Sequence, residues 1–312
     1  MLGASGFIGS HLCESLVARG DEVVALDNFV TGRRSNVSQL IANRSFTLVE
    51  ADITGGIPEL SGRFDAILDF ASPASPNDFK TMPLEILAVG STGTRNLLDR
   101  AVSDRARFFL ASTSEVYGDP LVHPQPETYW GNVSSIGPRS CYDEAKRFSE
   151  ALTMAYKRVH GVDTRIVRIF NTYGERMRPD DGRVVNTFVC QALRGEPITL
   201  HGDGSQTRSF CHVSDEVRGL VALLDSTFDH PVNIGNPGEF TMRQLADLVI
   251  ELTGSRSSII TVPLPPEREG DPAQRRPDIT LARTVLDWEP TVSLREGLTR
   301  MISYFRDVEG IR

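Results

Sequence analysis

The glycines near the amino terminus constrain the fold of this 312-residue chain more than any other feature. Gly3, Gly6 and Gly9 have the spacing G-x-x-G-x-x-G, and a helical pattern over residues 7–19 follows until Gly20 ends it. Glycines allow a tight turn and let the backbone approach a pyrophosphate, which binds at the N-terminus of the following helix. The stretch therefore predicts the turn and helix of a dinucleotide-binding unit.

The strand expected next, residues 22–26, ends at Asp27. A carboxylate about 20 positions beyond such glycines is placed to bind a ribose 2′-hydroxyl. The same carboxylate would repel a 2′-phosphate, so we predict NAD rather than NADP as the cofactor. Arg33 and Arg34 lie nearby in the sequence, and their positive charges leave the second cofactor open.

One part of the expected unit is missing from the sequence. A dinucleotide fold has a strand before its glycine turn, yet only Met1 and Leu2 precede Gly3. That strand would be central in a parallel sheet, and backbone groups of its neighbours would be unpaired without it. Our hypothesis is that the sequence starts too late, with Met1 inside the first strand. A mass measurement of the native protein with Met1 as its first residue would reject this hypothesis.

Strands and helices alternate up to residue 170, which predicts a doubly wound parallel α/β sheet of the Rossmann type. The expected strands are 46–50, 65–70, 107–111 and 163–170, and the expected helices are 83–103 and 139–160. The loop 71–76 contains prolines, which we expect to prevent a helix there. Gly90 and Gly93 lie inside the helix 83–103, either for close helix packing or to leave room for a site.

From residue 171 the pattern changes to that of a smaller α/β part. The expected elements are helices at about 183–194, 214–225 and 241–252, strands near 197–201 and 207–213, and a final helix capped by Ser293. An extended basic loop is expected over 263–277, with Arg268, Arg275 and Arg276. We predict an NAD-binding domain over 1–170, with returning segments near 207–235, and a mainly substrate-binding domain over 171–312. The cleft between them is the natural ligand site.

Composition excludes several classes of protein. The formal net charge of −8 argues against a general nucleic-acid binder. The four cysteines show no C-x-x-C and no zinc spacing, so we expect buried free thiols and no metal. The sequence shows no signal peptide and no apolar run of about 18 residues. We therefore expect no membrane partner and a cytoplasmic location.

Tyr142 and Lys146 form the first candidate catalytic pair. Their spacing places both side chains on one face of the predicted helix 139–160. An ammonium near a phenol favours the phenolate, which would lower a pKa of about 10 towards neutrality. Such a tyrosine could remove a proton from an alcohol. The spacing also occurs in many surface helices, but Ser112 to Glu115 follow a predicted strand, at the sheet edge where ligands bind.

Together the glycine turn, Asp27, the Thr113-Ser114-Glu115 strand end and Tyr-x-x-x-Lys resemble the extended short-chain dehydrogenase/reductase family. The resemblance covers nearly the whole chain apart from the first strand. Within the family, longer strings are similar to those of the UDP-glucuronate decarboxylases, which make UDP-xylose. These strings are LASTSEVYGDP (110–120), GPRSCYDEAKR (137–147), RIFNTYG (168–174), DDGRVVN (180–186), GDGSQTRSF (202–210), NIGNP (233–237) and RRPDI (275–279).

The resemblance implies a reaction in which NAD+ takes a hydride from sugar C4 while Tyr142 takes the hydroxyl proton. Lys146 would hold Tyr142 ionised and bind the nicotinamide ribose, and Thr113 would share the C4 oxygen. The resulting 4-ketone makes the C5 carboxylate a β-keto acid, which loses CO2 because the remaining electrons delocalise into an enolate. Return of the hydride gives UDP-xylose, regenerates NAD+ and needs no metal.

The resemblance also assigns the residues that discriminate this reaction. Glu115 would act with Ser114 around C5 and the carboxylate in proton transfer, and Arg275 would position the sugar and stabilise charge. Arg208 matches the arginine that binds the diphosphate, whose oxygens suit a guanidinium fork. The predicted substrate contacts are Asn171, Arg178, Arg183, Arg208 and Tyr117.

The predicted NAD site includes Tyr142 and Lys146 and continues along the ends of the first strands. Its other members are Gly3, Gly6, Phe7, Ile8, Gly9, Asp27, Asn28, Phe29, Thr31, Gly32, Asp52, Ile53, Ala71, Ser72 and Thr172. The partner is a UDP-sugar, bound in the mainly nucleotide-sugar-binding second domain. The resemblance also implies a homodimer formed through the helices 83–103 and 139–160.

Other readings stay open. A UDP-sugar 4-epimerase uses the same tyrosine, lysine and NAD+ but has no need of Glu115. A 4,6-dehydratase needs an Asp-Glu pair where this chain has Ser114-Glu115. An oxidative decarboxylase would release a 4-keto pentose and NADH. A non-catalytic NAD-binding protein would be credible if the amino terminus were truly truncated.

Overall fold

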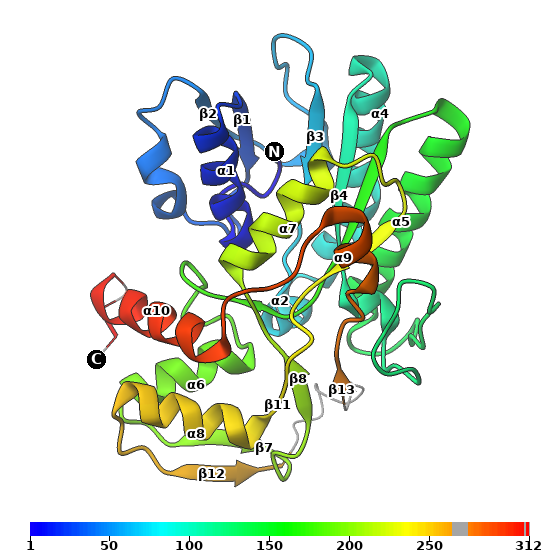
Figure 1. The fold of residues 1–312 in the computed structure, drawn as a ribbon. Coiled ribbons are helices and arrows are strands. Elements are labelled where there is room, and N and C mark those ends of the chain that lie inside the picture. The colour runs from blue at the N-terminus through cyan, green and yellow to red at the C-terminus, as the bar shows by residue number, and fades with distance from the viewer. Residues whose placement is uncertain (264–273, 309, 312) are drawn as a thin grey trace.

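The computed structural model describes residues 1–263, 274–308 and 310–311, and its centre is a parallel sheet (Figure 1). Four strands follow the order β10, β5, β4, β3, and β1 pairs with β2 in parallel beside them. Their bounds are β1 Val23–Asp27, β2 Phe46–Glu50, β3 Ala66–Asp69, β4 Arg107–Thr113, β5 Thr164–Ile169 and β10 Pro231–Ile234. The chain therefore has the predicted Rossmann-like fold.

Helices cover both faces of this sheet, as Figure 1 shows. One face packs against α1 (Phe7–Arg19), α7 (Val213–Asp225) and α9 (Thr280–Leu286). The other face packs against α4 (Thr94–Asp104) and α5 (Ser140–His160). Helix α1 has the predicted bounds, because Gly20 takes a left-handed conformation and donates its N–H to Leu16 O and Val17 O.

Met1 and Leu2 lie between β1 and β3 and join the two parts of the sheet. Leu2 N–H donates to Leu68 O at 2.9 Å, and Phe70 N–H donates to Leu2 O at 3.2 Å. On the other side, Leu26 N–H donates to Met1 O at 2.8 Å. These residues therefore make the pairings expected of the strand before the glycine turn. Whether Met1 is the native first residue stays a prediction.

The predicted helix 83–103 is divided into three pieces. Helix α3 (Pro83–Ala88) is followed by a π-helical turn, Val89–Gly93, and then by α4. A Cβ on Gly90 would lie 2.8 Å from the Cβ of Ala145, which is on α5 between Tyr142 and Lys146. Gly90 therefore serves close helix packing, here against α5, rather than leaving room for a site.

The second part of the chain lies below the sheet in Figure 1. It contains helices α6 (Val184–Leu193), α8 (Met242–Thr253) and α10 (Leu294–Asp307) and the parallel pair β7 (Ile198–His201) and β12 (Ile259–Val262). Two small sheets connect it to the first part: β6 (Thr172–Tyr173) with β9 (Cys211–His212), and β8 (Thr207–Ser209) with β11 (Glu239–Thr241) and β13 (Gln274–Arg275). Arg275 and Arg208 are register partners on β13 and β8.

Several short elements differ from the prediction. The loop 71–76 was expected to exclude a helix, but α2 (Pro76–Thr81) begins at its last residue. Proline is tolerated at the first helical position, and Ser75 and Asp78 form a capping box around it. Strands β10 to β13 and helix α9 were not predicted. Within the loop 263–277, residues 274–275 form a strand, and Arg268 lies outside the described residues.

None of the described helices combines the length and the apolar character that crossing a bilayer requires.

Candidate active site

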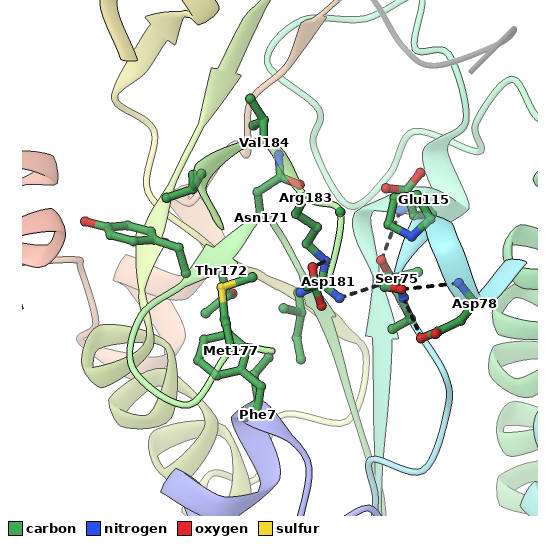
Figure 2. A pocket seen from close by; sticks show the side chains of 18 of the residues that line it. Phe7, Ser75, Asp78, Glu115, Asn171, Thr172, Met177, Asp181, Arg183 and Val184 are labelled. Atoms are coloured by element: carbon green, nitrogen blue, oxygen red, sulfur yellow. Dashed lines mark hydrogen bonds and ion pairs between the residues drawn. The ribbon is translucent and has the colours of Figure 1, made fainter. Parts of the chain in front are cut away.

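A cavity of about 560 Å³ lies where the carboxyl ends of the parallel strands face the second part of the chain. The residues after β3, β4 and β5 line one wall, and residues of α6, β7 and α8 line another. Figure 2 shows Glu115 and Ser75 on one side of this cavity and Asn171, Thr172 and Met177 on the opposite side. All six residues predicted to be catalytic line it: Thr113, Ser114, Glu115, Tyr142, Lys146 and Arg275.

Tyr142 is 6% exposed, and its phenol hydrogen-bonds the hydroxyl of Thr113 at the end of β4. Burial raises the pKa of Tyr142 to about 12, against the hydrogen bond from Thr113 and the charge of Arg183. The expectation that Lys146 lowers this pKa towards neutrality is therefore wrong for the protein alone. Desolvation of the phenolate outweighs the attraction of the nearby charges.

The side chain of Lys146 extends past the phenol of Tyr142 and reaches the backbone of β4. Its ammonium donates to Ala111 O at 2.8 Å and lies 6.0 Å from the centre of the Tyr142 ring. Burial lowers the pKa of Lys146, while the carboxylates of Asp69 and Glu150 oppose the shift. The position of Lys146 is thus fixed from three elements, β3, β4 and its own helix α5.

Two arginines hold the carboxylate of Glu115. Arg139 Nη2 donates to Oε2 at 2.6 Å, and Arg275 Nη1 donates to Oε1. Burial alone would raise the pKa of Glu115, but the charges and hydrogen bonds of Arg139 and Arg275 hold it well below its ordinary value. Glu115 is therefore ionised beside the phenol of Tyr142, and it carries no proton to give.

Arg139 is a site residue that the sequence prediction missed. It stands three positions before Tyr142 at the start of α5, so both side chains fall on one face of the helix. That spacing is the signal that could have found it. Its role could not be read from the sequence, because its partner Glu115 lies 24 residues away.

The glycine turn fits a bound dinucleotide. Helix α1 begins after Gly6 without a side-chain cap, so its first N–H groups, at the cavity wall, lack an intrahelical partner. Such a helix end binds phosphate oxygens. Gly3 has a φ of +68°, and a Cβ there would lie 2.5 Å from Phe70 O. The turn therefore requires glycine where β3 passes closest to it.

Asp27 organises the backbone at the end of β1. Its carboxylate accepts the N–H of Ser5 and of Phe29, both at 2.8 Å, and the residue is 7% exposed. A Cβ at Gly32 would lie 2.7 Å from this carboxylate. The nearby Arg34 pairs with Glu50, so its charge is not directed at Asp27.

The predicted cofactor residues divide into two groups. The first lines the cavity: Gly3, Gly6, Phe7, Ile8, Gly9, Thr31, Ser72, Tyr142, Lys146 and Thr172. The second lies behind the first at the strand ends and is not among the cavity-lining residues: Asp27, Asn28, Phe29, Gly32, Asp52, Ile53 and Ala71. Within this second group, Asn28 donates to the Asp52 carboxylate at 3.2 Å. The contacts of these residues with NAD stay predictions.

The predicted substrate residues also divide. Asn171, Arg178, Arg183 and Arg208 line the cavity. Arg178 is paired with the carboxylate of Asp78 at 3.0 Å, and Arg183 donates to Ala74 O at 2.9 Å. Both contacts hold the loop after β6 against the start of α2.

Tyr117 does not reach the cavity. It is 1% exposed, and its hydroxyl donates to Asn233 Oδ1 at 2.7 Å. The predicted contact of Tyr117 with substrate is therefore not formed, because the 3₁₀ turn Ser114–Tyr117 directs the ring into the protein.

Apolar side chains line the cavity on the side of the second part of the chain, where Phe7 packs against them. This wall contains Met177, Val185, Phe188, Leu200 and Met242. The sequence prediction missed these residues, because an apolar residue that faces a cavity follows the same helix or strand period as one that faces a core. Among the described residues, no cluster of three or more His, Cys, Asp or Glu side chains could hold a metal ion.

Glu216 on α7 lies behind Thr172 and is fully buried. The Thr172 hydroxyl donates to Glu216 Oε2 at 3.1 Å, and the same hydroxyl lies 2.9 Å from Phe170 O. Burial raises the pKa of Glu216 well above its ordinary 4.5, against hydrogen bonds from Thr172 and Cys211.

The raised pKa of Glu216 makes stability depend on pH. Glu216 keeps its proton in the folded state but releases it above pH 4.5 in the unfolded state. The free energy of unfolding therefore falls as the pH rises above 4.5. We expect Glu216→Gln to gain stability relative to the parent protein, by up to about 1.4 kcal/mol per pH unit, in urea unfolding between pH 5.5 and 8.5. Glu251→Gln, at an exposed pair with Arg295, is the control. Equal pH dependence of the parent and the Glu216 variant would contradict the assignment.

Comparison with known proteins agrees with this geometry. Residues 1–235 match the NAD dependent epimerase/dehydratase family. UDP-glucuronic acid decarboxylase 1 of Arabidopsis thaliana is 52% identical over 305 residues, which are 98% of this chain and 69% of that protein. UDP-glucuronic acid decarboxylase 1 of Danio rerio is 49% identical over 308 residues, 98% of this chain and 72% of that protein.

Among solved structures, the UDP-glucuronic acid 4-epimerase of Bacillus cereus in complex with UDP-glucuronic acid and NAD is similar, with a TM-score of 0.87. It is 28% identical, and the match covers 98% of each chain. The range 1–235 matched by the family contains the glycine turn, Asp27, Glu115, Tyr142 and Lys146. The chain therefore belongs to the NAD-dependent epimerase/dehydratase family.

Proposed function

We propose that this chain converts UDP-glucuronate to UDP-xylose and CO2. The observation that carries the proposal is the Glu115 carboxylate, ionised and held by Arg139 and Arg275 in the same cavity as Tyr142 and Thr113. Oxidation of the sugar at C4 needs a base at the C4 hydroxyl, and the loss of CO2 that follows leaves negative charge that nearby cations stabilise. Relatives about half identical over nearly the whole chain are UDP-glucuronic acid decarboxylases.

Tyr142 would remove the proton of the C4 hydroxyl, and Thr113, which hydrogen-bonds its phenol, would share the C4 oxygen. When bound, NAD+ supplies the acceptor for the C4 hydride, a positive charge that favours the phenolate, and later the hydride that is returned. The glycine turn, Thr31 and Ser72 would hold it, and Lys146 would fix the orientation of its nicotinamide ribose.

Oxidation at C4 makes the substrate a β-keto acid. The C5–C6 bond then breaks, CO2 leaves, and the electron pair delocalises onto the C4 oxygen as an enolate. The positive charges of Arg275 and Arg139 would stabilise the enolate that forms as CO2 leaves. One proton is taken up at C5 before the C4 carbonyl is reduced again.

Glu115 is ionised, so we propose that it accepts hydrogen bonds from the substrate or from a water that delivers the C5 proton. A direct donation by Glu115 would require it to lose both arginines first. Ser114, at the same wall of the cavity, would assist as a hydroxyl donor and acceptor. Arg208 would bind the diphosphate from the neighbouring strand β8.

The decisive experiment is incubation of the protein with UDP-glucuronate and catalytic NAD+, followed by measurement of CO2, sugar product and NADH. We expect equal amounts of CO2 and UDP-xylose without net NADH. A 4-keto pentose with stoichiometric NADH would identify an oxidative decarboxylase. UDP-galacturonate without CO2 would identify a 4-epimerase, and tight NAD binding without turnover a non-catalytic protein.

We also propose a homodimer formed through α3, α4 and α5. Three large apolar side chains are exposed there: Leu84 at 75%, Leu87 at 40% and Phe148 at 49%. Burying such side chains against a second copy stabilises association. Light scattering should give twice the 34.4 kDa of one chain, and Leu84→Glu with Phe148→Glu should give the monomer. A monomeric parent protein at micromolar concentration would reject the proposal.

A further inference from the structure

A chain of buried hydrogen bonds connects the turn that carries Glu115 with the strand that carries Arg275. It begins at Tyr117, the last residue of the 3₁₀ turn Ser114–Tyr117. The Tyr117 hydroxyl accepts from Arg168 Nη1 at 3.0 Å and donates to Asn233 Oδ1 at 2.7 Å. Arg168 has only donors, so the single hydrogen of Tyr117 must go to Asn233.

Asn233, on β10, is fully buried and forms the next part of the network. Its amide nitrogen donates to Gln125 O at 3.0 Å and to Asp278 O at 3.1 Å. Two carbonyl acceptors on this side require the amide nitrogen to face them, which leaves Oδ1 for Tyr117. The direction of these hydrogen bonds is therefore fixed at Tyr117 by Arg168 and at Asn233 by the two carbonyl oxygens.

Gln125 then holds the segment that follows β13. Its N–H donates to Arg276 O at 2.9 Å, and its side-chain oxygen accepts Arg276 N–H at 2.9 Å. Asp278 N–H donates to Gln125 O at 3.0 Å. Gln125 and Asn233 are both 0% exposed. The backbone groups of Arg276 and Asp278 are thus tied to the network that starts at Tyr117.

The two ends of this network meet again in the cavity. Arg275 Nη1 donates to Glu115, and its Nη2 donates to Gly118 O at 3.1 Å, next to Tyr117. Glu115 and Arg275 are 160 residues apart in the sequence, so their contact depends on how these two segments are held together. Arg168 is neutralised by a bidentate contact with Glu150 at 2.8 and 2.9 Å, which removes the cost of an unpaired charge.

We infer that Tyr117 and Asn233 are positioning residues that fix Arg275 against Glu115 for the decarboxylation step. The inference rests on the proposed function, because it assigns to these residues the geometry of the pair that acts on the carboxylate. Neither residue lines the cavity, so each acts through Arg275 and Glu115.

The test is Tyr117→Phe, which removes one hydroxyl and keeps the ring. Asn233 Oδ1 then has no donor, and β13 can move relative to Glu115. A shift of about 1 Å in a catalytic group costs up to about 10²-fold in rate, so we expect kcat for CO2 release to fall by about 10- to 100-fold. The Kd for UDP and for NAD, measured by calorimetry, should not change, because neither Tyr117 nor Asn233 lines the cavity in which both would bind.

A double-mutant cycle with Arg275→Lys separates positioning from a general loss of structure. If Tyr117 acts through Arg275, adding Tyr117→Phe to the lysine variant should lower kcat by less than about twofold. Tyr156→Phe is the matched control, since it also removes a phenol bonded to a side chain, that of Asp99, and should leave kcat unchanged. Gln125→Met, which removes the acceptor of Arg276 N–H, should lower kcat as Tyr117→Phe does.

Two outcomes would overturn the inference. One is a Tyr117→Phe variant with the kcat of the parent protein, and the other is an equal loss of kcat in the parent and Arg275→Lys backgrounds. If Tyr117→Phe lowers the Tm and also weakens UDP binding, the kcat of Gln125→Met becomes the test. Failure of the proposed function is distinguishable, because the parent protein would then release no CO2 at all.

Discussion

Tyr142→Phe is expected to lower kcat for UDP-xylose formation by about 10²- to 10⁴-fold, the usual contribution of a positioned acid–base group. The substitution removes the phenol oxygen, which hydrogen-bonds Thr113. The ring stays stacked on that of Phe79, and the two ring centres are 4.9 Å apart. The fold and the binding of NAD should therefore persist. The measurement is CO2 release from UDP-glucuronate at saturating NAD+, with NAD affinity determined separately.

The pH dependence sharpens this prediction. Burial raises the pKa of Tyr142 to about 12 in the protein alone, so the phenol is neutral over the working range. Any activity near pH 7 then depends on how far bound ligands lower that pKa, and the acidic limb of kcat should report the lowered value. Another group would be the base if Tyr142→Phe kept full activity, or if the pH profile of its kcat kept the same acidic limb.

Glu115→Gln is expected to give the second largest loss, about 10²- to 10³-fold in CO2 release, the scale found for one lost electrostatic contact to a developing charge. Glutamine has nearly the same shape, but it offers an amide where Arg139 or Arg275 needs an acceptor. Both guanidinium groups would then lack the carboxylate that orients them. Single-turnover mixing with UDP-glucuronate and NAD+ should still show NADH forming, because Tyr142, Thr113 and Lys146 are unchanged.

Glu251→Gln is the matched control for this substitution. Glu251 also accepts two hydrogen bonds from an arginine, Arg295, at 2.8 and 2.9 Å, but on the exposed surface. Exposed ion pairs contribute little, so the control should keep the parent activity. If Glu115→Gln abolished NADH formation as completely as CO2 release, the residue would act at C4 and the assignment to C5 would be wrong.

The local elements of the first part were predictable from short-range patterns. The glycine turn and the apolar spacing over Phe7–Arg19 determined α1 with its end at Gly20. The strands β2 and β3 and the helix α5 followed from runs of β-branched or periodic apolar residues and agree within one or two residues. The failure at Pro76 came from reading proline as a helix breaker where it is a first helical residue.

The site shows the limits of such patterns more clearly. Tyr142 and Lys146 lie on one face of α5, as their spacing predicted, yet Lys146 bonds Ala111 O rather than the phenol. Arg178 was expected to bind substrate, and it pairs with Asp78 from a segment 100 residues away. Tyr117 stands in a string typical of active-site loops, but its hydroxyl belongs to the buried network beneath the cavity.

The sequence by itself determined which groups are present and which helix or strand end carries each of them: the glycine turn, Asp27, Thr113 to Glu115, and the pair Tyr142 and Lys146. Only the tertiary structure decided which charges meet. Glu115 and Arg275 are joined across 160 residues by strands and buried hydrogen bonds that no local period encodes. Burial, which is a property of the assembled fold, then set the protonation of Tyr142 and Glu216, because desolvation acts on a charge only when the rest of the chain surrounds it. Glu115 stays ionised because the same fold brings Arg139 and Arg275 to its carboxylate.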